Sequence, residues 1–326
     1  MKQVKKIINF KKDINLAVFG DIILDRYLKG DVERISPEAP VPIVNIKSSF
    51  DRLGGAANVM NNTINLGAKT WAFGVVGNDK NGKNVKKKMA EKKINVDNLI
   101  TIPNRITSTK SRIISGNHQI TRFDHETTDE IPTKIQQKMI DGISKIISKI
   151  DMILISDYEK GVLTKKLIKD LFKIAKKNKI PLLVDPKYKN YQYYKGFEFV
   201  KINSVNAEKL TDIPTIQKNY EKICKLLLKK LDCKNIIVSL GKNGLIVMNN
   251  GKIIHIKTAA KQIYDVTGAG DVMTATLGIT LSRGYDLVTA CKIGNLASAI
   301  SISKVGTYSI SLKELINSIK NEGEQF

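Results

Sequence analysis

From residue 152 onward, short apolar runs alternate with longer stretches of helical character. The runs 152–156, 182–185 and 199–203 are rich in Ile, Leu and Val and predict buried strands. Helices are expected at 164–177 and 219–231. Strands that alternate with helices favour a mostly parallel sheet covered by helices on both faces. The sequence therefore predicts an α/β protein.

The same pattern extends toward both ends of the chain. Strands are predicted at 14–21, 70–76 and 235–240, a hairpin at 244–248 and 253–256 around Asn249-Asn250-Gly251, and helices at 56–65, 83–92, 272–282 and 287–303. Polar or glycine residues follow several of these strands. Ligands of open α/β sheets bind at the carboxyl ends of the strands, so this edge of the sheet is the expected binding site.

Two segments do not alternate with helices. The run 41–46 contains Pro42, which cannot donate to a central ladder and therefore suggests an edge strand. The runs 108–114 and 119–123 are typical of paired strands around Ser115-Gly116-Asn117. We interpret residues of about 26–50 and 105–125 as a small β lid. No linker divides the chain, so residues 1–326 are expected to form a single domain.

Composition excludes several classes of protein. No apolar run approaches the ~20 residues that span a membrane. The apolar run within the basic segment 1–12 is too short for the core of a signal peptide. Three cysteines without paired spacing suit a reducing compartment, so a cytoplasmic location is expected. The net charge is +23, but the lysines are scattered and arginines are few, which argues against nucleic acid and favours small anionic substrates.

The segment 265–271, Asp-Val-Thr-Gly-Ala-Gly-Asp, directly precedes a predicted helix. Backbone N–H groups at a helix N-terminus can hold a phosphate, and Gly268 and Gly270 would let it approach closely. Asp271 would lie beside that phosphate, where it could accept a proton from a substrate hydroxyl. An ordinary helix cap explains this short motif equally well on its own.

A second motif, Gly54-Gly55-Ala56-Ala57-Asn58, also precedes a helix. The glycines would let a sugar approach the backbone, and Asn58 can both donate to and accept from hydroxyls. Asp21 and Asp25 follow the first strand and suit vicinal hydroxyls of a sugar. A tight turn and capping residues remain the structural alternative.

With both motifs in this order, the chain resembles the ribokinase-like (PfkB) sugar kinases over about residues 14–318. Segments 20–27, 34–42, 156–161 and 304–307 look most like the D-glycero-β-D-manno-heptose-7-phosphate kinases within that family. The run Arg34-Ile35-Ser36-Pro37-Glu38-Ala39-Pro40 is the most specific of these. The resemblance implies a ribokinase-like fold and ATP-dependent phosphorylation of the anomeric hydroxyl of heptose 7-phosphate, in ADP-heptose and lipopolysaccharide core synthesis.

The resemblance also implies roles for individual residues. Asp271 would be the base, and Gly268, Ala269 and Gly270 would hold the transferred phosphoryl group. The sugar would be bound by Asp21, Asp25, Gly54, Gly55 and Asn58, and the nucleotide by Asn203, Asn206, Ser239, Gly241, Gly244 and Asn295. Mg²⁺ would bridge the phosphates. Lys160, just past a strand end, is a further predicted substrate or phosphate contact.

Six of the seven arginines lie in the first 122 residues, and only one lies beyond them. A planar guanidinium binds phosphate through two bonds, although structural ion pairs are an equal explanation. Lid strands of this family often pair two subunits. We therefore expect Arg34, Arg112 or Arg122 to meet the substrate's 7-phosphate, alone or across a homodimer.

The chain departs from the family pattern at Asn206, where a glutamate that orders Mg²⁺ is usual. Either Glu208 substitutes for it or metal binding is weakened. The three histidines lack the HxGH-type spacing of a nucleotidyltransferase, so no such domain is expected and the adenylyl step is assigned to another protein. Alternative functions are another PfkB-type kinase, for ribose, fructose or a sugar phosphate, and a non-catalytic sugar-binding regulator.

Overall fold

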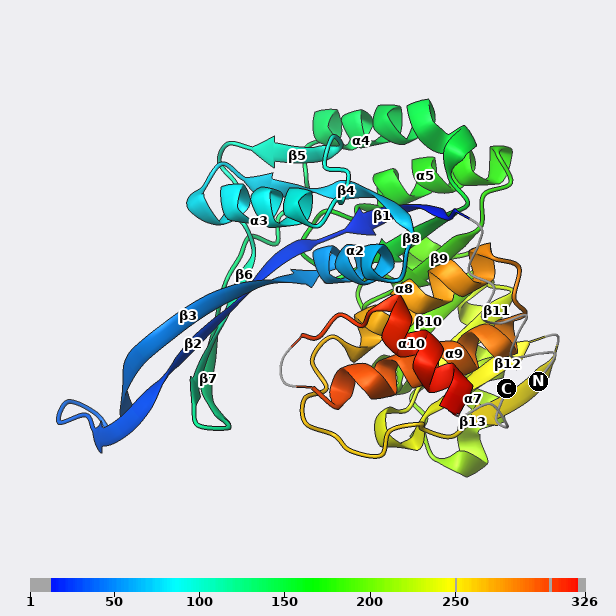
Figure 1. Cartoon of the computed structure of the whole chain (residues 1–326). Coiled ribbons are helices and arrows are strands. Elements are labelled where there is room, and N and C mark those ends of the chain that lie inside the picture. Colours follow the sequence, from blue (N-terminus) through cyan, green and yellow to red (C-terminus); the bar gives the residue numbers. More distant parts are fainter. Residues whose placement is uncertain (1–12, 250, 305–306, 322–326) are drawn as a thin grey trace.

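The computed structural model describes residues 13–249, 251–304 and 307–321, and a nine-stranded sheet crosses its main body (Figure 1). The strand order is β13-β12-β11-β10-β9-β8-β1-β4-β5, with only β12 and β13 antiparallel to their neighbours. The strands are β1 (Asn15–Gly20), β4 (Lys69–Gly77), β5 (Leu99–Ile102), β8 (Met152–Ser156), β9 (Leu182–Asp185), β10 (Phe199–Asn203), β11 (Asn235–Ser239), β12 (Leu245–Asn249) and β13 (Lys252–Ile256). The predicted α/β class is therefore confirmed.

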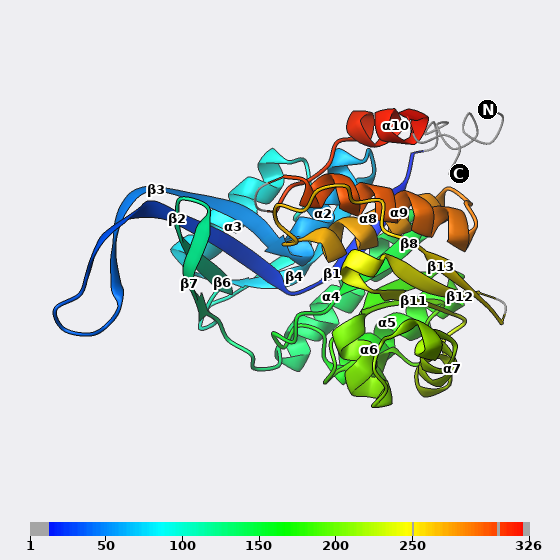
Figure 2. The same ribbon diagram turned by 90° about the horizontal axis from the view of Figure 1, so that it is seen from below.

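Helices cover both faces of this sheet, as Figure 2 shows from below. One face carries α2 (Ala56–Asn65), α3 (Lys80–Glu91), α8 (Ala269–Ser282), α9 (Leu287–Ile302) and α10 (Leu312–Asn321), and the other carries α4 (Thr133–Ile146), α5 (Lys165–Lys177), α6 (Ser204–Thr211) and α7 (Tyr220–Leu231). The central strands supply both cores, since Leu16 and Val18 of β1 pack on one face and Ala17 and Phe19 on the other. Strands buried on both faces explain the continuous apolar runs in the sequence.

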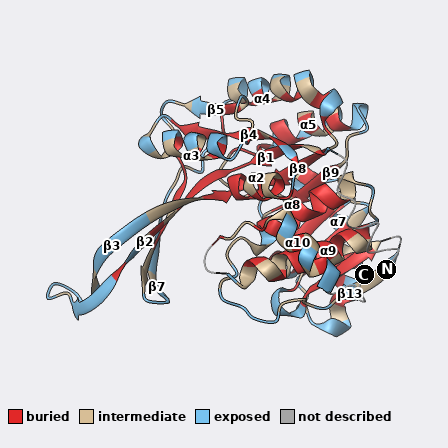
Figure 3. Cartoon of the chain, viewed as in Figure 1, coloured by how far each residue is buried: buried red, intermediate tan, exposed pale blue. Residues whose placement is uncertain are grey.

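A second sheet projects from the body as a long ribbon (Figure 1). Its order is β3-β2-β6-β7, formed by β3 (Pro42–Gly55), β2 (Ile22–Ile35), β6 (Thr109–Ser115) and β7 (His118–His125). We call these four strands the lid. Its base is buried against the body and its far part is exposed (Figure 3). Because β2 follows β1 after a single residue, the first body strand leads almost directly into the lid.

Several element predictions differ from the structure. The edge strand expected at 41–46 is part of a 14-residue strand, β3, and helix α3 begins three residues before the predicted start because Asp79 caps it, accepting from the N–H of Gly82 at 2.6 Å. Sequence analysis missed α4, α6, α10 and β5. Within the described ranges, no helix is long and apolar enough to cross a membrane. Asn250 of the predicted hairpin turn, residues 305–306 of the 304–307 motif and the segment 1–12 lie outside the described residues.

Candidate active site

Asp271 lies in the first turn of α8 and is only 4% exposed. The chain reaches this helix through Gly268, whose φ of 84° favours glycine. Asn58 donates its side-chain N–H to Oδ2 of Asp271 at 2.8 Å, and the hydroxyl of Tyr158 donates to Oδ1 at 2.7 Å. Burial raises the pKa of Asp271 to about 6, even though both hydrogen bonds and the Lys201 ammonium lower it. A carboxylate with this pKa is ionised at neutral pH and is well suited to accept a proton.

The two glycine motifs meet at this carboxylate, although Asn58 and Asp271 are 213 residues apart in the chain. Gly55, with φ of 55°, leads into α2 and places Asn58 in the first turn of that helix. A Cβ on Gly54 would lie 2.4 Å from the Asp25 carboxylate, and one on Gly268 would lie 2.8 Å from the Asn58 amide. Glycine is therefore needed at both positions for the motifs to come together.

One N–H group of the predicted phosphate cradle at the start of α8 is already hydrogen-bonded to the chain's own backbone. The N–H of Ala269 donates to the carbonyl of Val266 at 3.3 Å. The Ala269 N–H is therefore already engaged within the chain, and the phosphoryl contacts of Gly268, Ala269 and Gly270 remain predictions. The N–H groups of Gly268 and Gly270 and the positive end of the helix dipole would face an anion at this end of α8.

Asp21 fixes the loop that follows β8. Its carboxylate accepts from the backbone N–H groups of Tyr158, Lys160 and Val162 at 2.8, 3.2 and 3.3 Å. Burial, followed by the charge of Asp157, raises the pKa of Asp21 to about 6. These bonds hold Tyr158 against Asp271, so Asp21 has a structural role in the site, and its predicted contact with the sugar remains a prediction. Tyr158 was missed as a site residue, although its position just after a strand end was a usable signal.

The other predicted substrate residues are distributed over the lid and its base. Asp25 and Arg112 form a buried ion pair of 2.7 Å, with the Arg112 guanidinium 5.3 Å from the Tyr27 ring. Arg122 is partly exposed and pairs with Asp124, and Arg34 is exposed near the far end of β2. Arg112 and Arg122 thus occupy paired positions on β6 and β7, whereas Arg34 lies apart from them near the far end of β2.

Lys160 lies where β8 ends, as expected, but its ammonium is paired with the carboxylate of Glu126. Its backbone carbonyl accepts from the guanidinium of Arg105, which also donates to the carbonyls of Thr127 and Asp129. These contacts tie the loop after β8 to the segment that follows the lid. A role of Lys160 in binding substrate remains a prediction.

Four of the six predicted nucleotide residues line one cavity of about 180 Å³ beside the start of α8. They are Ser239, Gly241, Gly244 and Asn295, and they are joined there by Ala269 and Gly270. A Cβ on Gly244 would lie 2.1 Å from the carbonyl oxygen of Ile256, and its φ is 85°, so glycine shapes this wall. The apolar and polar lining suits a nucleotide whose phosphates reach the helix N-terminus.

Lys201 is a buried cation in the wall of the same cavity, and sequence analysis missed it. The residue lies on β10, is 2% exposed, and its ammonium pairs with the Asp185 carboxylate. A Cβ on Gly270 would lie 3.3 Å from that ammonium. A positive charge therefore stands directly beside the cradle at the start of α8.

Asn203 and Asn206, the remaining two predicted nucleotide residues, do not line this cavity. Asn203 caps α6 by accepting from the N–H of Asn206 at 2.8 Å, and the Asn206 amide lies 3.5 Å from the carbonyl of Pro186. Glu208, the alternative to the usual glutamate, is exposed and accepts from the N–H and hydroxyl of Thr215, so its role in ordering Mg²⁺ remains a prediction. In the described part of the chain, no group of three or more His, Cys, Asp or Glu side chains is placed to hold a metal ion.

Comparison with known proteins agrees with this arrangement. The family model described as pfkB family carbohydrate kinase matches residues 13–314. The bifunctional protein HldE of Geobacter sulfurreducens is 36% identical over 98% of this chain and 65% of its own length, and that of Sulfurimonas denitrificans is 38% identical over 92% of this chain and 63% of its own length. The chain thus spans less than two thirds of the length of these relatives.

Solved structures share the fold. Ribokinase of Arabidopsis thaliana, complexed with ribose and ATP, superposes with a TM-score of 0.74 at 17% identity, covering 95% of this chain and 99% of that chain. Phosphofructokinase-2 of Escherichia coli, in complex with substrates and products, gives 0.79 at 18% identity, again covering 95% and 99%. At these identities the likeness is one of fold, and it agrees with the family match over residues 13–314. The chain belongs to the pfkB family of carbohydrate kinases.

Proposed function

We propose that this carbohydrate kinase uses ATP to phosphorylate the anomeric hydroxyl of D-glycero-β-D-manno-heptose 7-phosphate, giving the 1,7-bisphosphate for ADP-heptose and lipopolysaccharide core synthesis in the cytoplasm. The observation that carries the phosphoryl transfer is the buried Asp271 carboxylate, held by Asn58 and Tyr158 at the edge of the nucleotide cavity. The choice of heptose is supported by the resemblance of segments 34–42 and 156–161 and by the similarity to HldE proteins.

The reaction follows from this placement. Asp271 takes the proton of the anomeric hydroxyl as the sugar oxygen bonds to the γ-phosphorus. The bond from that phosphorus to the β,γ-bridging oxygen breaks, and ADP leaves. The N–H groups of Gly268 and Gly270 and the ammonium of Lys201 would stabilise the transferred phosphoryl, and the support for this is that Gly270 and Lys201 line the same cavity. Mg²⁺ would be carried mainly by the nucleotide phosphates, because Asn206 offers an amide where a carboxylate is usual.

A substrate panel tests this proposal. With ATP, we expect kcat/KM to be highest for heptose 7-phosphate among heptose 7-phosphate, fructose 6-phosphate, fructose and ribose. A higher value for one of the other three sugars would favour another PfkB-type activity. Binding of a sugar without turnover of any would favour the non-catalytic regulator, and would contradict the role given to Asp271.

A homodimer through the lid is part of the proposal. Exposed apolar side chains are frequent on the lid, where Ile35, Val41 and Phe123 are half or more exposed and Ile46 nearly so. Such side chains on one projecting sheet are typical of an interface between subunits. Light scattering should report a dimer for the wild type and a monomer for Phe123→Lys with Ile46→Lys; a wild-type monomer at micromolar concentration would exclude it.

The lid arginines are expected to set the affinity for the substrate's phosphate. Arg34 lies near the end of β2, in the part of the lid that projects from the body (Figure 1), so its contact would have to come through the second subunit. We expect Arg34→Ala, Arg122→Ala or Arg112→Ala to raise KM for the sugar phosphate about tenfold, the loss of one charge-assisted contact. Unchanged KM in all three variants would contradict the assignment.

Arg112 needs its own control, because it neutralises a buried carboxylate. Truncating Arg112 leaves Asp25 buried and unpaired, which costs about 3–5 kcal/mol of stability. The double variant Arg112→Met with Asp25→Asn removes both charges and separates this structural loss from a loss of phosphate binding. A KM that rises in the double variant while its unfolding midpoint recovers would assign the Asp25–Arg112 pair to the substrate, and Asp25→Asn alone would show how much of the rise belongs to Asp25.

A further inference from the structure

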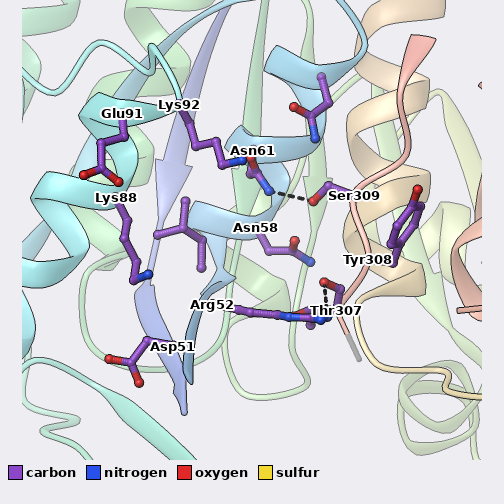
Figure 4. A pocket seen from close by; sticks show the side chains of 12 residues that line it. Asp51, Arg52, Asn58, Asn61, Lys88, Glu91, Lys92, Thr307, Tyr308 and Ser309 are labelled. Carbon is purple, nitrogen blue, oxygen red and sulfur yellow. Dashed lines mark hydrogen bonds between the residues drawn. The ribbon is translucent and has the colours of Figure 1, made fainter. Parts of the chain in front are cut away.

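A second cavity, of about 310 Å³, lies on the outer side of α2 and is not used by the proposed reaction. Its walls come from α2, α3, the end of β3 and residues 307–309 (Figure 4). Asn58, Asn61 and Asn65 line it from successive turns of α2, although the Asn58 amide donates to Asp271 and that of Asn61 to Ser309. The cavity is polar and is separate from the nucleotide cavity.

The charge that this cavity offers to a ligand is positive. Lys88 lies in the last turn of α3 and Lys92 directly follows that helix, and Arg52 crosses from β3 toward Thr307 (Figure 4). Among the described residues, neither lysine forms an ion pair. Of the two acids in the lining, Asp51 pairs with Arg26 at 2.8 Å, whereas Glu91 is exposed and lies 4.0 Å from Lys87, so the lining carries three cations against one weakly paired acid.

Thr307 gives an independent indication that a ligand belongs here. It is 8% exposed, and its hydroxyl has no hydrogen-bond partner in the described part of the chain, although its carbonyl accepts from Arg52 at 2.8 Å. Buried hydroxyl groups are normally hydrogen-bonded, and an unpaired one costs about 1–3 kcal/mol. The hydroxyl oxygen of Thr307 has almost no accessible surface, so a ligand oxygen in the cavity would satisfy it once the Thr307 side chain rotates toward the cavity.

We propose that this cavity binds a phosphoryl group, held by Lys88, Lys92 and Arg52 with the Thr307 hydroxyl donating to it. Ammonium and guanidinium groups are the usual partners of phosphate oxygens, and a hydroxyl completes the set. Asn58 lines the cavity and also donates to Asp271. A phosphoryl group bound here therefore stands one side chain away from the catalytic base. It can come from a free phosphate or from the sugar phosphate itself, in which case this cavity would replace the lid arginines as the phosphate site.

Binding of inorganic phosphate tests the site without relying on the proposed function. Calorimetry would be performed with a saturating non-hydrolysable ATP analogue, whose γ-phosphoryl group would occupy the cradle at α8. We expect the double variant Lys88→Ala, Lys92→Ala to weaken phosphate binding about tenfold or more, and Thr307→Val to weaken it by a few-fold. The matched control is Lys80→Ala, Lys83→Ala, which removes two exposed lysines of α3 that do not line the cavity. Equal affinity in wild type and in the Lys88, Lys92 variant, or no binding at all, would overturn the proposal.

Kinetics then distinguish the two sources. If the sugar phosphate fills the cavity, the Lys88, Lys92 variant raises its KM about tenfold without lowering kcat to the same degree, and phosphate competes with the sugar. If a free phosphate fills it, KM is unchanged, and phosphate alters kcat in the wild type but not in the variant. The kinetic measurement rests on the proposed function, whereas the calorimetry of phosphate binding does not. Failure of turnover and failure of the cavity site are therefore distinguishable.

Discussion

Asp271→Asn is expected to lower kcat by about 10²–10⁴-fold, the range for removal of a general base. The amide cannot take the proton of the sugar hydroxyl. It has the same shape, however, and its oxygen can still accept from Asn58 or Tyr158, so the site should keep its geometry. Steady-state kinetics would measure kcat, and calorimetry the sugar affinity, which we expect to change less than about threefold. Retained turnover would show that another group is the base.

The pH dependence gives an independent measure of the same group. Burial raises the pKa of Asp271 to about 6, and only the ionised carboxylate can accept a proton. We therefore expect kcat/KM of the wild type to fall about tenfold per pH unit below pH 6. The residual activity of Asp271→Asn should lack this fall, and a fall of the same size in the variant would assign the titration to another group, such as Asp21.

Stability shows whether the variant is inactive for chemical or for structural reasons. The folded-state pKa of Asp271 lies above the ordinary value of 3.8, so the buried charge opposes folding. Because the folded protein holds this proton more tightly than the unfolded chain, the free energy of unfolding is highest below about pH 4 and decreases as the pH rises through 6. At pH 8, Asp271→Asn should therefore be more stable than the wild type, by up to roughly 3 kcal/mol, and the difference should disappear near pH 4. A variant that is less stable at both pH values would not support the catalytic interpretation.

Much of the main sheet could be predicted from the sequence because its central strands are buried on both faces. β8, β9 and β10 are short apolar runs that end at polar residues, and their predicted bounds agree with the structure. The motifs around Asn58 and Asp271 were recognisable because their glycines stand before helices. That these motifs face one another was implied by the family resemblance, and the 2.8 Å hydrogen bond now gives the geometry.

The contacts that decide the site's chemistry could not be predicted in the same way. Lys201 resembles any of the many lysines in this chain, and only its burial beside Asp185 and Gly270 distinguishes it. Tyr158 depends on Asp21, which binds the loop through backbone N–H groups that carry no sequence signal. Helix α4 was missed because it has no side-chain cap and buries only Gln136, Met139 and Ile143. These features arise from tertiary packing.

Lys201→Met is expected to lower kcat/KM for ATP by about 10²–10³-fold, the effect of removing one preorganised group that stabilises the transferring phosphoryl. The ammonium lies beside the start of α8 in a buried wall, where little water screens its charge. Nucleotide affinity by calorimetry and single-turnover rates would separate binding from transfer. Lys242→Ala is the matched control, because Lys242 lines the same cavity but is exposed.

The partner of Lys201 must be controlled, since the change leaves the Asp185 carboxylate without its cation. Lys201→Met with Asp185→Asn removes both charges, whereas Lys201→Arg keeps the positive one. If Lys201 contacts the phosphoryl group, activity should fall in the double variant and recover partly in Lys201→Arg. Because Asn206 supplies no charge, Mg²⁺ would then become the main counter-charge for the phosphates, so Lys201→Met should also raise the Mg²⁺ concentration needed for half-maximal rate. A loss of less than about tenfold with an unchanged Mg²⁺ requirement would limit Lys201 to pairing with Asp185.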